Sequence, residues 1–370
     1  MKKLTLIATL LFLSILVKAQ GIDLSKIQLP EGFKIEIFAQ DIPDARSLAS
    51  TPDGKTIFVG NRSRKNVYAL TDTDGDMIAD KTDIIATGLT MPNGVAFHNG
   101  DLFVAEVSKI HRFPNIMDNL ASPKSEVIYE DFPTERHHGW KFIAFGPDGK
   151  LYVPVGAPCN VCDREEEIFA TITRMDPDGS NLEIYASGVR NSVGFTWDPK
   201  TQKMWFTDNG RDRLGDNIPA CELNYAPEKG MHFGFPYWHQ GDIADPDFGD
   251  KFPQDKFTAP SYKFEPHSAP LGLRFYQGDM FPAKYKNNII VAQHGSWDRS
   301  KDVGHIGYQL RFVQIEGDKV VSSEIFATGW LDKAENKGWG KPVDILELPD
   351  GSILVSDDVA GAIYRISYQK

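Results

Sequence analysis

The sequence has few cysteines, and their arrangement excludes several classes of metal and redox protein. Its 370 residues include only Cys159, Cys162 and Cys221. A zinc site built from two ligand pairs would need a second pair, which Cys221 alone does not provide. No βαβ pattern surrounds the first two cysteines, as a thioredoxin-like motif would require. We therefore expect a Cys159–Cys162 disulfide in an oxidising compartment and one leftover thiol.

Long apolar runs are also missing, apart from one at the N-terminus. The run from Leu4 to Val17 follows a basic start and is too short to anchor the chain in a bilayer. Val17-Lys18-Ala19 fits the small-x-small pattern that precedes a cleavage site. We expect residues 1–19 to be a secretory signal peptide, so that the protein is periplasmic or secreted. Residues 20–370 are then a mature chain with no membrane span.

Basic residues are fewer than acidic residues. The chain carries 40 basic and 51 acidic residues, a net charge of −11. A surface this acidic argues against nucleic acid or anionic lipid as a partner, and it is compatible with small neutral substrates and calcium. No Ser/Gly-rich linker divides the sequence, so we expect a single domain.

What the chain does contain is one pattern repeated from end to end. An apolar run meets a turn such as Pro-Asp-Gly, and a second apolar run follows. Pro presets φ at such a turn and Gly supplies the positive φ, so each repeat predicts a β-hairpin. Radial repetition of small antiparallel sheets is typical of propellers, and we predict an all-β, six-bladed β-propeller. The hairpins are expected at residues 47–60, 94–105, 142–153, 193–206, 271–292 and 343–355.

The two ends of the domain are expected to meet. Residues 33–38 and 362–367 are the first and last strand-like segments of the domain. Pairing them in the last blade would close the ring and remove the exposed sheet edges. We expect about four strands in each blade.

Two stretches carry residues suited to chemistry. Residues 136–141 come directly before the third hairpin, and residues 188–195 contain the start of the fourth. Equivalent positions in successive blades point to one axis, so we expect His138, Lys141 and the Arg190–Asn191 pair to share a pocket. A histidine there suits a general base near neutral pH, although a loop histidine bound only by backbone groups is the simpler alternative.

These residues resemble those of the soluble sugar dehydrogenases that depend on pyrroloquinoline quinone (PQQ), a group that includes glucose, aldose-sugar and sorbosone dehydrogenases. The resemblance runs from about residue 29 to residue 368, and each of its motifs falls at a blade boundary. The motifs are His138-x-x-Lys141, Gly188-x-Arg-Asn191, Phe206–Asp212, Cys221–Asn224 with His232–Pro236, Gln293–Arg299 and Gly340–Asp344.

The resemblance implies an exported quinoprotein oxidoreductase. It would oxidise a hydroxyl or aldehyde of an aldose or sorbosone-like sugar by hydride transfer to PQQ. His138 would be the general base and Arg190 would stabilise the developing oxyanion, while calcium would act as a Lewis acid. The implied partners are a small sugar substrate and an unidentified electron acceptor.

The same resemblance assigns the cofactor contacts. The three carboxylates of PQQ require cationic partners. Main-chain carbonyls that map to Gly210 and Arg211 would hold calcium, for which carbonyl oxygens are suitable ligands. Three departures from the glucose dehydrogenases favour the aldose or sorbosone branch. His137 replaces an acidic residue, a single cation precedes the last blade, and Gly210-Arg211 replaces a Gly-Pro pair. The residues assigned to PQQ are Lys141, Asn191, Arg211, Arg299 and Lys341.

An acidic run suggests a second calcium site. Its carboxylates occupy positions 1, 3, 5, 9 and 12 of an EF-hand-like loop, a spacing that suits oxygen ligation. Met77 stands where that loop needs glycine, and no helices are expected around it, so a solvated acidic turn is the alternative. The candidate ligands are Asp72, Asp74, Asp76 and Asp80, with Asp83 in the last position.

Two other function classes stay open. A calcium-dependent propeller lactonase or hydrolase would need an axial calcium, for which Glu106, Asn191 and Asp208 are available. A cationic pocket would then serve no purpose. A non-catalytic binding propeller would not need the pairings of His138 with Lys141 and of Arg190 with Asn191.

Overall fold

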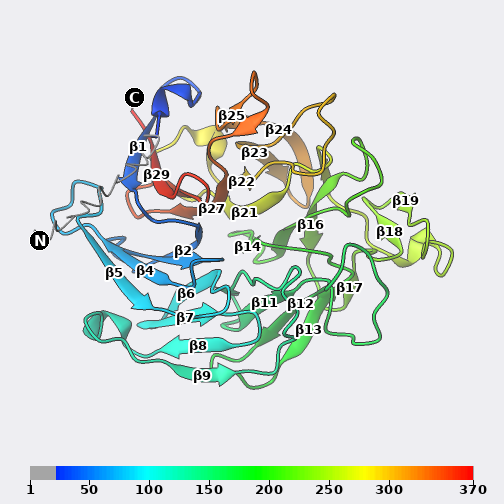
Figure 1. Cartoon of the computed structure of the whole chain (residues 1–370), viewed down its shortest axis with the longest axis horizontal. Helices are drawn as coiled ribbons and strands as arrows, with labels where there is room; N and C mark the ends of the chain where they lie inside the picture. The colour runs from blue at the N-terminus through cyan, green and yellow to red at the C-terminus, as the bar shows by residue number, and fades with distance from the viewer. Residues whose placement is uncertain (1–21, 370) are drawn as a thin grey trace, which may run out of the picture.

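Six sheets surround a central axis in the computed structural model, which describes residues 22–369 (Figure 1). The predicted signal peptide, residues 1–19, lies outside the described residues. Within them the only helices are four short 3-10 turns, so the predicted all-β, six-bladed propeller is confirmed. The turns are η1 (Leu24–Lys26), η2 (Ile116–Asp118), η3 (Gln254–Lys256) and η4 (Ala283–Tyr285).

The first three blades follow the order of the chain, and each begins with its innermost strand (Figure 1). Blade 1 is β2 (Ala45–Ser50), β3 (Thr56–Asn61), β4 (Val67–Thr71) and β5 (Lys81–Ala86). Blade 2 is β6 (Gly94–His98), β7 (Asp101–Ala105), β8 (Ile110–Phe113) and β9 (Glu126–Tyr129). Blade 3 is β10 (Ala144–Phe145), β11 (Leu151–Val155), β12 (Thr171–Met175) and β13 (Glu183–Ser187), with β17 (Met231–His232) as a fifth strand parallel to β13.

The other three blades continue the ring. Blade 4 is β14 (Phe195–Trp197), β15 (Met204–Asp208), β16 (Cys221–Ala226) and β20 (Tyr262–Phe264). Blade 5 is β21 (Pro270–Phe275), β22 (Ile289–Gln293), β23 (Gln309–Glu316) and β24 (Lys319–Thr328). Blade 6 is β27 (Pro342–Glu347), β28 (Ile353–Asp357), β29 (Ala362–Tyr368) and β1 (Phe33–Ala39). Two small hairpins stand outside the blades: β18 (Trp238–His239) with β19 (Ile243–Ala244), and β25 (Leu331–Asp332) with β26 (Lys337–Gly338).

Each predicted hairpin forms the first two strands of a blade. In blade 1, Leu48 lies opposite Val59, and Gly54 takes a φ of +71° in the turn between them. Gly149 takes a φ of +76° in the corresponding turn of blade 3. Glycine adopts this left-handed conformation without steric cost, and this explains the repeated Asp-Gly of the turns.

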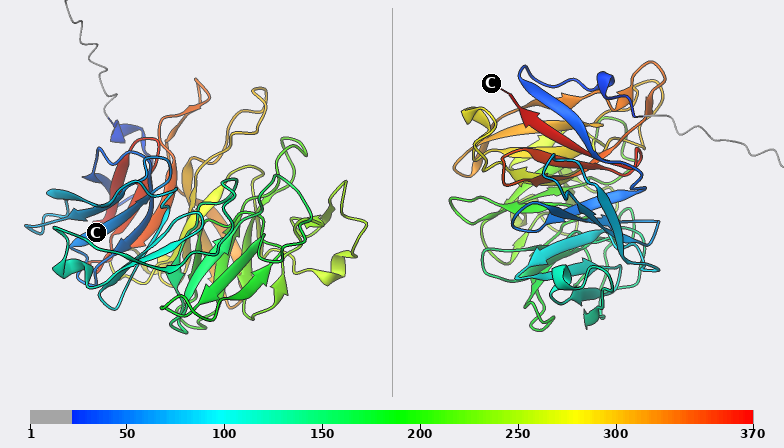
Figure 2. Two further views of the ribbon diagram at one scale, coloured as in Figure 1. Left: turned by 60° about the horizontal axis from the view of Figure 1, so that its bottom comes forward. Right: turned by 90° about the vertical axis from the view of Figure 1, so that its left-hand side faces the viewer.

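The ring closes between its first and last strands, as the sequence predicts. β1 pairs antiparallel with β29, with Ile35 opposite Ile366, and the two strands lie side by side in Figures 1 and 2. The first and last strands of the described chain are therefore held in one sheet, in which β1 is the outer strand.

Neighbouring blades pack through large side chains that alternate along the strands. Trp205 and Phe206 follow each other in β15 and are both fully buried. Side chains that are adjacent along a strand point to opposite faces. Trp205 accordingly packs on Phe275 of blade 5, whereas Phe206 belongs to the cluster that contains Tyr152 of blade 3. Burial of one such side chain stabilises the fold by about 1.5–3 kcal/mol.

Long loops rise from one face of the ring, among them the hairpin β25–β26 (Figure 2). In the loop after β11, Cys159 and Cys162 form the predicted disulfide. Cys221 is the buried free cysteine. None of the helices in residues 22–369 has the length and apolar character needed to cross a bilayer.

Candidate active site

A cavity of about 400 Å³ opens at one end of the ring. The innermost strand of a blade begins, and its neighbour ends, at the same edge of the sheet because the two run antiparallel. Residues before the first strand and after the second strand therefore meet there, and five of the six blades contribute to the wall. Lining residues include Arg46, His138, Arg190, Gly210, His294 and Lys341.

His138 is buried in this wall with its imidazole held in one orientation. Its Nδ1 lies 2.9 Å from the carbonyl oxygen of Ala157. A carbonyl only accepts hydrogen bonds, so Nδ1 carries the proton in the neutral ring and Nε2 keeps a lone pair. Gly156 makes this approach possible, because a Cβ there would lie 2.6 Å from Cβ of His138. The backbone of His138 itself has a φ of +51°.

The surroundings of His138 keep its imidazole neutral. Burial lowers its pKa well below the ordinary 6.5, and the charges of Arg190 and His137 lower it further. The two histidine rings are 4.1 Å apart, and both residues line the cavity. Within the described residues the His138 ring has a hydrogen-bond partner and the His137 ring has none, so His138 is the better oriented of the two.

Arg190 is buried and bound by two loops, the one after β11 and the one after β15. Its Nε and Nη2 donate to the backbone and side-chain oxygens of Asn160, at 2.8 and 2.9 Å. Its Nη1 donates to the carbonyls of Asn209 and Gly210, at 3.1 and 2.9 Å. Nη2 also pairs with Asp212 at 3.1 Å. Such a network holds the guanidinium in place beside the cavity.

The backbone of the Arg190–Asn191 pair is fixed by a buried carboxylate. The two oxygens of Asp208 accept the backbone N–H of Arg190 at 2.8 Å and that of Asn191 at 2.7 Å. Burial raises the pKa of Asp208 to about 6, and these two bonds oppose the rise. Asn191 is thereby placed on the cavity wall next to Arg190.

Two cations on the wall have no anionic partner. Lys341 and Arg62 both line the cavity, and neither forms an ion pair with another described residue. The ammonium of Lys341 lies 5.0 Å from the centre of the Tyr308 ring, and burial lowers the pKa of this lysine. The guanidinium of Arg62 lies 5.2 Å from the centre of the Trp140 ring. Such cations favour an anionic ligand in the cavity.

Sequence reasoning missed Arg62 and also a further cation of the wall, Arg46. It donates to Asn93 at 2.8 Å and to Asp358 at 2.9 Å. Asp358 also binds His294 on the wall at 2.9 Å, and these partners hold the pKa of Asp358 well below its ordinary value despite burial. Arg46 stands directly before the first predicted hairpin, and this position was the available signal.

Three residues assigned to the cofactor lie away from the cavity wall. Lys141 is buried, donates to the carbonyl of Gly139 at 3.3 Å and has its pKa lowered to about 7 by burial. Arg211 pairs with Asp245. Arg299 donates to the carbonyl of Gly304 in its own loop at 2.9 Å and to that of Asp216 in the loop after β15 at 2.8 Å. Their cofactor contacts stay predictions that this arrangement does not favour, whereas Asn191 and Lys341 are on the wall as expected.

Of the two proposed calcium ligands, Gly210 and Arg211, only Gly210 lies on the cavity wall. Gly210 lines the cavity, and its carbonyl accepts Nη1 of Arg190 at 2.9 Å. A carbonyl oxygen has two lone pairs, so one acceptor site stays open for a cation. The side chain of Arg211 pairs with Asp245, so only the main-chain carbonyl of Arg211 is available to bind calcium. The residues present are therefore compatible with calcium at Gly210.

The acidic loop brings together part of its predicted ligand set. One oxygen each of Asp72, Asp74 and Asp80 lie within 4.8 Å of one another. Asp76 is not in this group, and its Oδ1 accepts the N–H of Ile78 at 2.8 Å. Met77 adopts a φ of +69° where an EF-hand has glycine. Calcium binding at this loop stays a prediction.

The residues of the hydrolase alternative do not meet in the cavity. Glu106 binds His111 at 2.6 Å, and Asp208 is occupied by backbone N–H groups. Only Asn191 of that set lines the cavity. The arrangement does not favour a side-chain calcium of the hydrolase type.

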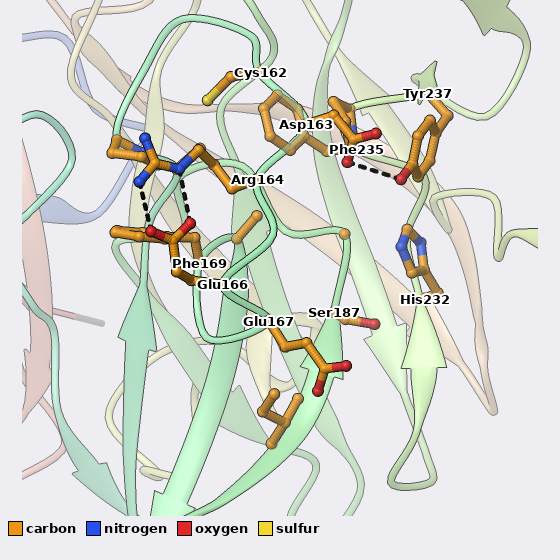
Figure 3. A pocket seen from close by; sticks show the side chains of 16 residues that line it. Cys162, Asp163, Arg164, Glu166, Glu167, Phe169, Ser187, His232, Phe235 and Tyr237 are labelled. Atoms are coloured by element: carbon orange, nitrogen blue, oxygen red, sulfur yellow. Dashed lines mark hydrogen bonds and ion pairs between the residues drawn. The ribbon is translucent and has the colours of Figure 1, made fainter. Parts of the chain in front are cut away.

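A second cavity, of about 330 Å³, is lined by the loop after β11 and by residues 232–237 (Figure 3). Its polar groups largely pair with one another. The hydroxyl of Tyr237 donates to Asp163 at 3.0 Å, and Arg164 pairs with Glu166 at 2.8 Å. Burial lowers the pKa of His232 to about 4. None of the predicted site residues lines this cavity.

Comparison with known proteins identifies the family. The family model of glucose/sorbosone dehydrogenase matches residues 104–365. An uncharacterized protein of Borreliella burgdorferi is 34% identical over 382 residues, which cover 99% of this chain and 97% of the relative. The aldose sugar dehydrogenase YliI of Escherichia coli is 26% identical over 196 residues, 51% of this chain and 45% of the relative.

A solved structure shows the same fold. The holo form of the pyranose dehydrogenase PQQ domain from Coprinopsis cinerea superposes with a TM-score of 0.77 at 16% identity, and the match covers 92% of this chain and 97% of that one. At this identity the likeness concerns the propeller alone. The family match, which spans most of the chain, carries the assignment: the protein belongs to the glucose/sorbosone dehydrogenase family.

Proposed function

We propose that the protein is a PQQ-dependent dehydrogenase that oxidises a sugar of the aldose or sorbosone class at the axial cavity. The observation that carries this proposal is the pairing of a neutral, oriented histidine with unpaired cations in one cavity. Lys341 and Arg62 suit the carboxylates of PQQ, and the relatives include an aldose sugar dehydrogenase and a PQQ-binding domain. When bound, PQQ would supply the carbonyl that accepts the hydride.

The residues of the chain then have distinct tasks. His138, with Nε2 free, accepts the proton of the substrate hydroxyl. Arg190 is held rigidly by Asn160 and Asp212, so it presents fixed positive charge where an oxyanion develops. Lys341 and Asn191 bind the cofactor from the wall. Calcium at the Gly210 carbonyl would act as a Lewis acid there.

We propose further that the protein is exported and acts in the periplasm or outside the cell. The apolar run from Leu4 to Val17 and the site after Ala19 support export. The disulfide between Cys159 and Cys162 fits an oxidising compartment. Electrons would leave through a separate acceptor after sugar oxidation.

Reconstitution tests the proposed function directly. Purified mature protein is mixed with PQQ and calcium, the cofactor is followed by its absorbance, and dye reduction is measured with aldoses, sorbosone and simple alcohols. We expect bound PQQ and reduction with at least one sugar. Tight PQQ binding without turnover on any of these substrates would contradict the assigned substrate class, and absence of PQQ binding would contradict the cofactor.

A further inference from the structure

Three side chains with metal-binding atoms meet at the cavity wall, and no role proposed so far accounts for this grouping. They are Asp212 after β15, His267 before β21 and Asp298 after β22. One ligand atom of each lies within 4.8 Å of those of the other two. Asp212 and His267 line the same cavity as His138. The cluster thus joins blades 4 and 5 beside the candidate active site.

Each of the three side chains is held by one atom and keeps another available. Nε2 of His267 donates to the carbonyl of Gly215 at 2.8 Å, which leaves the Nδ1 lone pair free. Oδ2 of Asp212 accepts Nη2 of Arg190 at 3.1 Å. Oδ2 of Asp298 accepts the backbone N–H of Arg213 at 3.0 Å. No hydrogen bond to the other carboxylate oxygen of either aspartate occurs within the described residues.

This arrangement is the one that supports metal ligands in proteins. A ligating histidine donates its second ring N–H to a carbonyl or carboxylate, and ligating carboxylates are hydrogen-bonded in turn. The outer partners set the orientation of the ligand before the ion arrives. His267 is buried, so its free Nδ1 has little competing water. Gly215 and Arg213, both in the loop after β15, supply two of these outer contacts.

From this geometry we infer that Asp212, His267 and Asp298 form a binding site for a divalent transition-metal ion such as Zn²⁺. One nitrogen and two carboxylate oxygens suit such an ion, whereas calcium prefers oxygen ligands alone. Ligand atoms around tetrahedral zinc are about 3.4 Å apart, so small side-chain rotations close the present separations. Three protein ligands leave a coordination position for water or a ligand hydroxyl.

This site is separate from the calcium expected at Gly210. That calcium is assigned to main-chain carbonyls, and the present cluster uses side chains only. Binding of an ion here needs neither PQQ nor a sugar. The inference therefore stands or falls independently of the proposed function.

Cobalt titration of metal-free full-length mature protein tests the site. Co²⁺ bound by a histidine and two carboxylates in a four-coordinate site absorbs strongly in the visible range, and Zn²⁺ should displace it. We expect one equivalent of Co²⁺ per chain in the unaltered protein. Asp298→Asn keeps the acceptor for Arg213 and should weaken binding at least tenfold. His267→Gln should do the same and should remove the nitrogen-dependent spectrum.

Asp255→Asn, at an exposed carboxylate in η3, is the control and should leave the titration unchanged, and Asp80→Asn tests whether Co²⁺ binds the acidic loop of blade 1 instead. Thermal melting curves establish that each variant is folded. Unchanged Co²⁺ affinity in both Asp298→Asn and His267→Gln would overturn the inference. Loss of Co²⁺ binding in Asp80→Asn alone would also overturn it. The same holds if Ca²⁺ at the same concentration displaces Co²⁺, or if the unaltered protein binds no Co²⁺.

Discussion

At the scale of single residues, the cavity is defined by which charges are neutralised and which are not. Arg46 is balanced by Asp358, and Arg190 is balanced by Asp212. Lys341 and Arg62 face the cavity without such a partner among residues 22–369. An anionic ligand would neutralise the charges of these two residues. Their unpaired charge is the strongest local argument for PQQ.

Replacement of Lys341 tests that argument. Lys341→Ala should weaken PQQ binding by about 2–5 kcal/mol, because a desolvated carboxylate loses its cationic partner. Lys341→Arg should retain most of the affinity. Lys141→Ala is the informative comparison. Lys141 does not line the cavity, so its replacement should reduce the affinity for PQQ much less. Titration of PQQ absorbance measures all three, and equal effects at both lysines would contradict this placement of the cofactor.

The pH dependence of the reaction follows from the environment of His138. A histidine acts as a general base only when its ring is neutral, and burial with Arg190 nearby lowers the pKa of His138 well below 6.5. The acid form is therefore populated only at lower pH, and kcat/KM should hold steady as pH falls to 6.5 and decline below it. Steady-state dye reduction across this range gives the profile, with circular dichroism as the check on folding. A half-loss of kcat/KM well above pH 6.5 would disagree with this environment.

At the scale of elements, the disulfide loop after β11 is a structural support of the site. Its Asn160 accepts two hydrogen bonds from Arg190 and one from the backbone N–H of Asp212. The amide of Asn160 also donates to the carbonyl of Asp212 at 3.0 Å. The loop therefore positions the residue that is assigned to the developing charge.

Asn160→Ala should lower turnover by about ten- to a hundredfold, because a small displacement of a catalytic group has a large kinetic effect. The KM for the sugar should change much less, since the loss concerns charge that develops in the transition state. Asn181→Ala, at an exposed asparagine of the same blade, is the control. A KM change with unaltered kcat would argue against a positioning role for Asn160.

Sequence patterns predicted the elements better than the contacts between them. Each hairpin could be found because Pro-Asp-Gly turns and apolar runs are local signals. The positions of His138, Arg190 and Lys341 followed because residues just before an inner strand face the axis. Lys141 does not line the cavity because its segment packs on Phe132, whose ring centre is 5.1 Å from the Lys141 ammonium. No local sequence pattern encodes this contact. The Asp212, His267 and Asp298 cluster likewise depends on three distant loops.

At the scale of the whole molecule, the propeller is held by closure of its ring. β1 joins blade 6, and Phe33 at its start contacts rings of blades 5 and 6, including Phe326 at 5.0 Å and Tyr368 at 4.9 Å. The first strand of the chain thus seals the junction where the last blade meets its neighbour. The cavity depends on this closure, because its wall draws on both sides of the ring.

Phe33→Ala should destabilise the whole domain by about 2 kcal/mol, less than for a fully buried phenylalanine because Phe33 is half-buried. Lys34→Ala, next along the same strand, removes only an exposed ion pair with Glu36 and should change stability by less than about 0.5 kcal/mol. Urea unfolding followed by tryptophan fluorescence measures both. Equal stability of the two variants would show that this contact does not hold the ring closed.

The most direct test of the account is the comparison of His138→Gln with His137→Gln in protein reconstituted with PQQ and calcium. Steady-state dye reduction by an aldose is measured, with cofactor occupancy checked by absorbance. His138→Gln should keep the cofactor bound and lose turnover by roughly 10²–10⁴-fold, and His137→Gln should lose far less. Full turnover of the His138 variant at full occupancy, or loss confined to the His137 variant, would contradict the assignment of His138 as the base.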